Sequence, residues 1–335
     1  MLDERNTGTR LIRSIAHRLA GDPVDLPDEG RLGSFERATG WVNSPPLTAE
    51  SLIGRVVLVD FWTYTCVNWL RTLPYLRAWD EKYRDAGLTI IGVHTPEFGF
   101  EHDAENVITQ VRELGVGYPV ALDNDYGVWN EFANHYWPAV YLADAAGRLR
   151  YHHFGEGEYA RTEMVIQQLL TANGAEIDMD LVDVQPTGLE VAADWSTLRS
   201  PETYLGSAQS SGFDEDRAPF DLPLNHWSLT GAWKVRRDAA VLEAPGGRIA
   251  FRFHSRDVNL VMGPVAPGVG VSVRVFLDGR PVENALDTDL GAGGRTVVRE
   301  QRTYQLIRTE GGISDRVVEI EFLDGGVEAY CFTFG

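Results

Sequence analysis

The sequence between residues 56 and 83 predicts a buried strand followed by a helix, with one cysteine between them. The apolar run Val56–Phe61 has the composition of a fully buried strand, whereas Leu70–Tyr83 carries apolar residues at helical spacing. Cys66 stands between the two. A redox-active dithiol at such a turn needs a second cysteine three residues later, and Trp69 occupies that position. Chemistry at this turn is therefore predicted to depend on a single thiol.

The alternation of strands and helices continues to residue 172. Strands separated by helices are typical of β-α-β units, which predicts a largely parallel central sheet. The further strands expected are Leu88–Val93 and Ala139–Leu142, and the further helices are Asn106–Leu114 and Thr162–Ala172.

After residue 176 the chain has runs of strand composition and almost no helical periodicity. Several short strands with turn signals predict an all-β antiparallel sandwich, jelly-roll-like in architecture. Asp278-Gly279 and Asp324-Gly325 are expected to be hairpin turns between such strands. The predicted organisation is an N-terminal helix and linker (1–30), an α/β domain (31–176) and a β sandwich (177–335).

The chain is strongly acidic, with a net charge of −19 over 335 residues. Phosphate backbones and anionic membranes repel such a chain, so neither nucleic acid nor a membrane is expected as a partner. The sequence contains no apolar run of the roughly 18 residues that a membrane span needs. Charged residues interrupt the apolar positions of Leu11–Leu19, a pattern typical of a short amphipathic helix rather than an export signal. We therefore expect a cytoplasmic protein.

Several motifs resemble those of thioredoxin-like proteins. Asp60-Phe61-Trp62, Cys66, Pro74, Trp137-Pro138 and Leu142-x-Asp144-x-x-Gly147 match thioredoxin-like folds in order and spacing. Segments similar to the redoxin part of DipZ- and TlpA-like proteins are 61–66, 92–98, 121–124 and 154–157, and segments that resemble the DipZ β domain, often described as carbohydrate-binding-like, are 247–253 and 326–330. The resemblance implies an α/β thioredoxin-like fold followed by the sandwich, with chemistry like that of thiol-disulfide oxidoreductases.

The resemblance also implies roles for individual residues. Cys66 corresponds to the nucleophile and Asp60 to a buried acid that shuttles protons, while Trp137-Pro138 corresponds to a cis-proline loop that pairs with an extended substrate. The start of a helix favours the thiolate form of Cys66. That effect lowers a thiol pKa by less than about 1.5 units from about 8.5.

Other candidates carry two interpretations each. Trp69 lies one helical turn after Cys66, so it is either a flat contact for a ligand or ordinary packing. His94 and Glu97 are expected in the loop after the second main strand, where His94 acts as a base near Cys66 or only orders the loop. Tyr64 is expected at the rim of the site. Cys331, in an apolar strand pattern, is a buried inert thiol or a resolving thiol.

The leading functional hypothesis is a lone-cysteine redox protein that acts on disulfides or oxidants through a mixed disulfide or a sulfenate. The alternatives are a redox-inactive binding or scaffold module and a one-cysteine thiol peroxidase. Expected partners are protein or low-molecular-weight thiols and disulfides, with a saccharide or protein ligand for the β domain. No cofactor is expected, because the sequence has no phosphate loop or dinucleotide fingerprint. No metal is expected either, since His152 and His153 point to opposite faces of a predicted strand.

Overall fold

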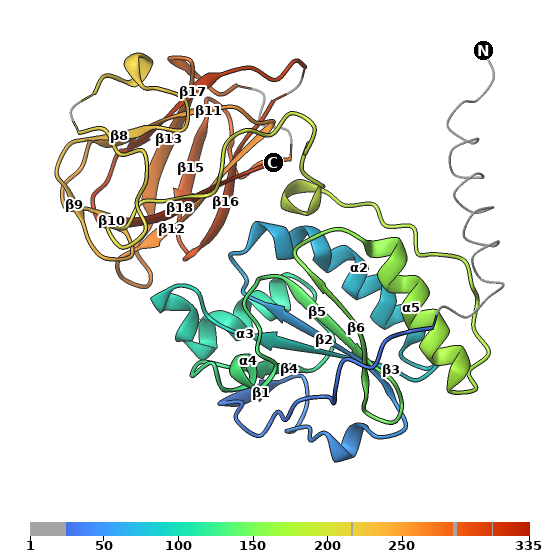
Figure 1. Ribbon diagram of the computed structural model, residues 1–335. Coiled ribbons are helices and arrows are strands. Elements are labelled where there is room, and N and C mark those ends of the chain that lie inside the picture. The colour runs from blue at the N-terminus through green and yellow to red at the C-terminus, as the bar shows by residue number, and fades with distance from the viewer. Residues whose placement is uncertain (1–24, 216, 284–286, 310) are drawn as a thin grey trace, which may run out of the picture. The chain divides into compact units, whose positions relative to one another are not determined.

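A computed structural model describes residues 25–215, 217–283, 287–309 and 311–335 (Figure 1). These residues form two compact units. One comprises residues 25–64 and 72–185, and the other comprises residues 65–71 and 186–335. The helix expected at Leu11–Leu19 lies outside the described residues, and the boundary expected at residue 176 stays a prediction.

The first unit is an α/β structure built on one sheet. Its strands are β1 (Gly40–Val42), β2 (Val56–Trp62), β3 (Leu88–His94), β4 (Val120–Leu122), β5 (Ala139–Ala143) and β6 (Leu149–Phe154). Its helices are α2 (Val67–Tyr83, whose first turn is grouped with the second unit), α3 (Ala104–Glu113), α4 (Gly127–Glu131) and α5 (Tyr159–Ala172), with short 3₁₀ helices at Glu50–Leu52 and Gly99–His102. Within the described ranges, no helix is long and apolar enough to cross a membrane.

The sheet is mixed, so the expectation of a largely parallel sheet was wrong. Its strand order is β1-β4-β3-β2-β5-β6. Only β2 with β3 and β3 with β4 pair in parallel, whereas β1, β5 and β6 pair antiparallel to their neighbours. For the β5–β6 pair, the physical reason is the tight turn after Ala143, because a turn this short can join only antiparallel strands.

Side-chain alternation along β2 divides the two faces of this sheet. Val57, Val59 and Phe61 are buried in a cluster with Val128, Trp129 and Phe132 from α4 and the residue after it. Because side chains of a strand alternate between faces, Asp60 and Trp62 point to the opposite face. Figure 1 shows α2 and α5 side by side along the sheet.

Buried Glu163 of α5 joins α2 to α5. Its carboxylate accepts hydrogen bonds from Trp79 Nε1 (3.1 Å) and from the Tyr83 hydroxyl (2.6 Å), both on α2. The backbone N–H of Val182 donates to both oxygens of the same group (3.0 and 3.1 Å), so the segment after α5 is tied to the same carboxylate. A side chain that is 2 % exposed thus holds three segments together.

The second unit consists of antiparallel strands. They are β7 (Thr203–Tyr204), β8 (Trp227–Thr230), β9 (Trp233–Val235), β10 (Ala240–Leu242), β11 (Gly247–Phe253), β12 (Asp257–Pro264), β13 (Val271–Leu277), β14 (Arg280–Pro281), β15 (Arg295–Val298), β16 (Arg302–Arg308), β17 (Arg316–Phe322) and β18 (Val327–Phe334), with 3₁₀ helices at Gly188–Glu190 and Pro219–Asp221.

Two sheets enclose the core of this unit, which confirms the predicted sandwich. One has the order β16-β12-β18-β10-β9 with β7 beside β18, and the other has the order β14-β13-β17-β11-β8 with β15 beside β13. Phe251 of one sheet packs against Phe332 of the other, with ring centroids 5.0 Å apart. Trp227 and Tyr304 are buried in this core.

The two predicted hairpin turns have different outcomes. Asp278 and Gly279 join β13 to β14, which pair directly, and both residues have the positive φ (50° and 76°) that a tight hairpin requires. Asp324-Gly325 instead connects β17 to β18, which belong to different sheets. The second turn is therefore a crossover between sheets, and the prediction of a hairpin there was wrong.

Candidate functional site

Cys66 lies at the start of α2. Its carbonyl oxygen accepts the hydrogen bond of Leu70 N–H at 3.0 Å, which places Cys66 at the N-cap position of the helix. Cys66 is partly exposed, and it forms no disulfide with Cys331. A sulfur at an N-cap lies next to the amides that the first helical turn leaves without helical partners, and these amides favour a thiolate.

Contacts with the C-terminal strands hold the chain around Cys66. The Thr303 hydroxyl of β16 donates to the Thr65 carbonyl at 2.7 Å, and Arg71 Nη2 donates to the Phe334 carbonyl at 3.1 Å. Both hydrogen bonds are buried, and all their atoms belong to the second compact unit. The segment that carries Cys66 is thus fixed on both sides by strand residues that the sequence did not single out.

The indole of Trp69 is completely buried. It occupies the position three residues after Cys66 that a resolving cysteine would need. Complete burial favours ordinary packing over the ligand-contact interpretation. Cys331 on β18 is also buried (1 % exposed), and its Sγ donates to the Phe332 carbonyl at 3.4 Å, as an inert core thiol does.

Asp60 is a fully buried acid in the middle of β2. It pairs in register with Gly92 of β3, and a Cβ at Gly92 would lie 3.1 Å from the Tyr118 ring. The missing side chain at Gly92 therefore makes room for Tyr118 on the face that carries Asp60. Burial, followed by the negative charge of Asp60, raises the pKa of Tyr118 well above its ordinary value.

His94 is the last residue of β3, so its expected place in the following loop was wrong. The imidazole lies edge-on to Trp62 (centroids 4.8 Å apart) and is stacked on Tyr64 (5.6 Å, 19° between planes). Neither ring nitrogen has a hydrogen-bond partner among the described side chains and backbone groups. Burial lowers the pKa of His94 to about 3, so the ring is neutral near pH 7.

The loop after β3 is ordered by an acid that sequence reasoning missed. The backbone N–H groups of Glu97 and Phe98 donate to Glu101 Oε2 at 2.7 and 2.9 Å, and Glu101 is completely buried. Glu101 therefore orders this loop through its backbone N–H groups. An acid three residues after the start of a short helical turn is a recognisable signal for such a cap.

A second missed acid, Asp123, caps α4. Its carboxylate accepts from the N–H groups of Val128 and Trp129, both at 2.8 Å, and it is completely buried. Burial raises the pKa of Asp123 although these amides act against the shift. Trp129 also packs against Trp137, with centroids 4.4 Å apart.

The peptide bond between Trp137 and Pro138 is cis, as predicted. Trp137 is half-buried, Pro138 is buried, and the Pro138 carbonyl accepts from Gly155 N–H at 2.8 Å. Of the predicted substrate-binding residues, Trp137 and Glu97 retain exposed surface, whereas Tyr64, His94 and Trp69 are buried. Among these residues, Trp137 and Glu97 therefore have side chains that solvent can reach.

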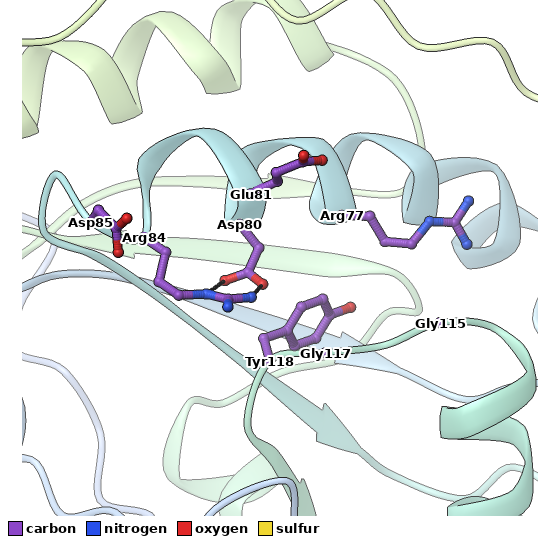
Figure 2. A pocket seen from close by; sticks show the side chains of 8 residues that line it. All are labelled: Arg77, Asp80, Glu81, Arg84, Asp85, Gly115, Gly117 and Tyr118. Atoms are coloured by element: carbon purple, nitrogen blue, oxygen red, sulfur yellow. Dashed lines mark hydrogen bonds and ion pairs between the residues drawn. The ribbon is translucent and has the colours of Figure 1, made fainter.

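A pocket of about 390 Å³ lies along the second half of α2 (Figure 2). Its lining residues are Arg77, Asp80, Glu81, Arg84, Asp85, Gly115, Gly117 and Tyr118. Figure 2 shows the ion pair of Arg84 with Asp80 above the ring of Tyr118. None of the predicted site residues lines this pocket, and two of its charges already neutralise each other. It is therefore not the candidate site.

Comparison with known proteins supports the resemblance derived from the motifs. Residues 200–335 match the family described as thioredoxin like C-terminal domain. The chain is 39 % identical over 271 residues to protein DipZ of Mycobacterium tuberculosis, an alignment that covers 77 % of this chain and 38 % of DipZ. It is 28 % identical over 131 residues to the thiol-disulfide oxidoreductase YkuV of Bacillus subtilis, which covers 39 % of this chain and 87 % of YkuV.

Among solved structures, a thioredoxin-like protein in the oxidised form is 27 % identical, with a TM-score of 0.39, and the match covers 42 % of this chain and 97 % of that one. The chain spans less than two fifths of the length of the DipZ proteins that it matches. The strand order of the first sheet and the matches to DipZ agree with the thioredoxin-like motifs in the sequence. The chain is thus a thioredoxin-like α/β domain followed by an antiparallel β domain, similar in sequence to part of the DipZ proteins.

Proposed function

We propose that this protein is a thiol redox protein that uses Cys66 as a lone nucleophile. The observation that carries the proposal is the position of Cys66, a partly exposed thiol at the N-cap of α2. The similarity to the oxidoreductase YkuV supports thiol-disulfide chemistry as the reaction class.

The reaction that fits a lone thiol is disulfide exchange with outside resolution. The Cys66 thiolate attacks one sulfur of a disulfide, a new S–S bond to Cys66 forms, and the other sulfur leaves as a thiolate. A second, external thiol then attacks this mixed disulfide and releases Cys66. Trp69 cannot perform that second step, so the resolving thiol is a low-molecular-weight thiol or a partner protein.

The surrounding residues have different proposed roles. Asp60 would exchange protons during this chemistry, and its complete burial supports a carboxyl that is protected from bulk solvent. Trp137, Pro138 and Glu97 would contact the substrate, which their residual exposure or their place in the cis-proline loop supports. Buried Tyr64, His94 and Trp69 would shape the site by packing.

The proposal extends to partners and location. Disulfides of proteins or of small thiols are the proposed substrates, and a saccharide or protein ligand is proposed for the β domain. We further propose a TlpA-like role in redox homeostasis of the cytoplasm, a location supported by the low cysteine content of two residues in 335. Cell fractionation with an antibody against the full chain tests the location.

The reaction is tested by trapping the mixed disulfide. The full chain is incubated with glutathione disulfide and then digested, and the modification of each cysteine is measured by mass spectrometry. Glutathione on Cys66 that is removed by added thiol supports the proposal, with Cys66→Ser as the negative variant and Cys331→Ser as the matched control. Absence of modification at Cys66 would identify the chain as a redox-inactive module. A sulfenate after dilute peroxide, without disulfide exchange, would identify a thiol peroxidase.

A further inference from the structure

The strands on both sides of β12 contact the segment that carries Cys66. Thr303 belongs to β16 and is paired with Val261 of β12, and Phe334 belongs to β18 and is paired with Val258 of β12. Each of the two strands supplies one hydrogen-bonding group to residues 65–71. Sheet pairing fixes the backbone of both residues.

The first contact acts on the peptide unit that precedes Cys66. The carbonyl of Thr65 and the N–H of Cys66 belong to one planar peptide, so a bond to the carbonyl also sets the direction of the N–H. Thr303 Oγ1 donates to that carbonyl at 2.7 Å. On the other side of Cys66, its own carbonyl is held by Leu70 N–H at 3.0 Å. Both peptide units next to the thiol are therefore fixed.

The second contact holds the helix turn that follows. Arg71 is 3 % exposed, and its guanidinium donates to the Phe334 carbonyl at 3.1 Å and reaches Asn68 Oδ1 at 3.5 Å. A Cβ at Gly335 would lie 2.3 Å from Arg71 Nη2, so a side chain at residue 335 would displace the guanidinium from this position. Residues 67–71 at the start of α2 are thus anchored by a charge-assisted hydrogen bond.

From these contacts we propose that the C-terminal β strands position Cys66 for reaction, with Thr303 and Arg71 as positioning residues. The inference deepens the proposed function, because it names what orients the nucleophile. It assigns the β domain a direct part in thiol chemistry, in addition to the saccharide or protein ligand proposed for it. Without the Thr303 hydroxyl, the Thr65–Cys66 peptide would rotate more freely, and the helix-start amides would stabilise the thiolate less.

The test compares alkylation rates of Cys66 in full-length variants. Iodoacetamide forms an S–C bond and releases iodide, so its rate at pH 7 reports the thiolate fraction and the access to Cys66. Thr303→Val removes the donor at nearly constant volume, and we expect the rate to fall about threefold, within the range of helix-end effects. Thr309→Val is the matched control, because the buried Thr309 hydroxyl has no hydrogen-bond partner among the described residues. Its rate should stay at the wild-type value.

Two further variants keep the test decisive if Thr303→Val does not fold. Thr303→Ser retains the hydroxyl and should restore the wild-type rate, and Arg71→Lys should lower the rate because a lysine lacks the planar fork. Equal rates in wild type, Thr303→Val and Arg71→Lys would overturn the inference. The outcome is independent of the proposed function, since alkylation needs no disulfide turnover. A protein that forms the mixed disulfide at Cys66 but shows equal rates refutes the positioning role alone.

Discussion

The buried imidazole of His94 should make this protein less stable as the pH falls below about 6.5. Burial lowers the pKa of His94 to about 3, whereas a histidine in an unfolded chain titrates near 6.5. Between these values the unfolded chain binds a proton that the native protein does not bind. The stability contribution of neutral His94 is therefore complete above about pH 6.5 and is lost as the pH falls toward 3.

The size of the loss follows from the two pKa values. Proton linkage gives a decrease in the free energy of unfolding of about 2 kcal/mol between pH 7 and pH 5, and about 3 kcal/mol between pH 7 and pH 4. Other groups titrate in the same range, so the wild-type curve alone does not isolate His94. His94→Phe retains an aromatic ring between Trp62 and Tyr64 and removes the titrating group.

The assay is urea unfolding of both proteins at pH 7, 6 and 5, followed by tryptophan fluorescence. The difference in unfolding free energy between wild type and His94→Phe should shift by about 2 kcal/mol toward the variant as the pH falls from 7 to 5. His135→Gln, at an exposed histidine, is the control and should follow the wild-type curve. A difference that stays constant over this range would refute a neutral, desolvated His94.

Three further substitutions test the packing around the site. Gly92→Ala should destabilise the protein by about 1–3 kcal/mol, because the new Cβ would lie 2.7 Å from Trp62 Nε1; unchanged thermal unfolding would contradict that crowding. Glu163→Gln should cost about 2 kcal/mol in urea unfolding, since the carboxylate accepts hydrogen bonds from α2 and from Val182; a neutral result would mean that these bonds are not made. Tyr118→Phe should leave stability unchanged or raise it by about 1 kcal/mol, because the buried hydroxyl has no partner among the described residues; a clear loss in a thermal melt would show that the hydroxyl is bonded.

The sequence predicted the elements that local patterns determine. The apolar run at Val56–Phe61 and the helical spacing of Leu70–Tyr83 correspond to β2 and α2, with the helix beginning three residues earlier at Val67. Strand and helix periodicity are local properties, so a single sequence is enough to find them. The position of Cys66 between these elements followed directly.

Strand direction and sheet membership were less predictable. The turns Asp278-Gly279 and Asp324-Gly325 have similar composition, but one closes a hairpin and the other crosses between sheets. The choice depends on which strands pair with β18, and its neighbours are β12 and β10 rather than β17. The sequence around the turn gives no indication of these distant pairing partners.

The polar groups that hold the candidate site together were missed for the same reason. Glu163 accepts hydrogen bonds from residues 79, 83 and 182, and Thr303 donates to residue 65. Each bond, apart from that to residue 182, joins positions at least 80 residues apart, so an isolated acid or threonine in the sequence gives no indication of it. Cys66 and the cis bond before Pro138 were found because motif residues carry them.

The central claim is that Cys66 is a reactive thiol at the start of α2, and its pH–rate profile tests this most directly. Native protein is alkylated with iodoacetamide between pH 5 and 10, and the labelling of Cys66 and Cys331 is followed separately by peptide mass spectrometry. We expect Cys66 to react much faster than Cys331, with a midpoint between about pH 7 and 8.5. Labelling of Cys66 only after denaturation, at the rate of Cys331, would contradict it.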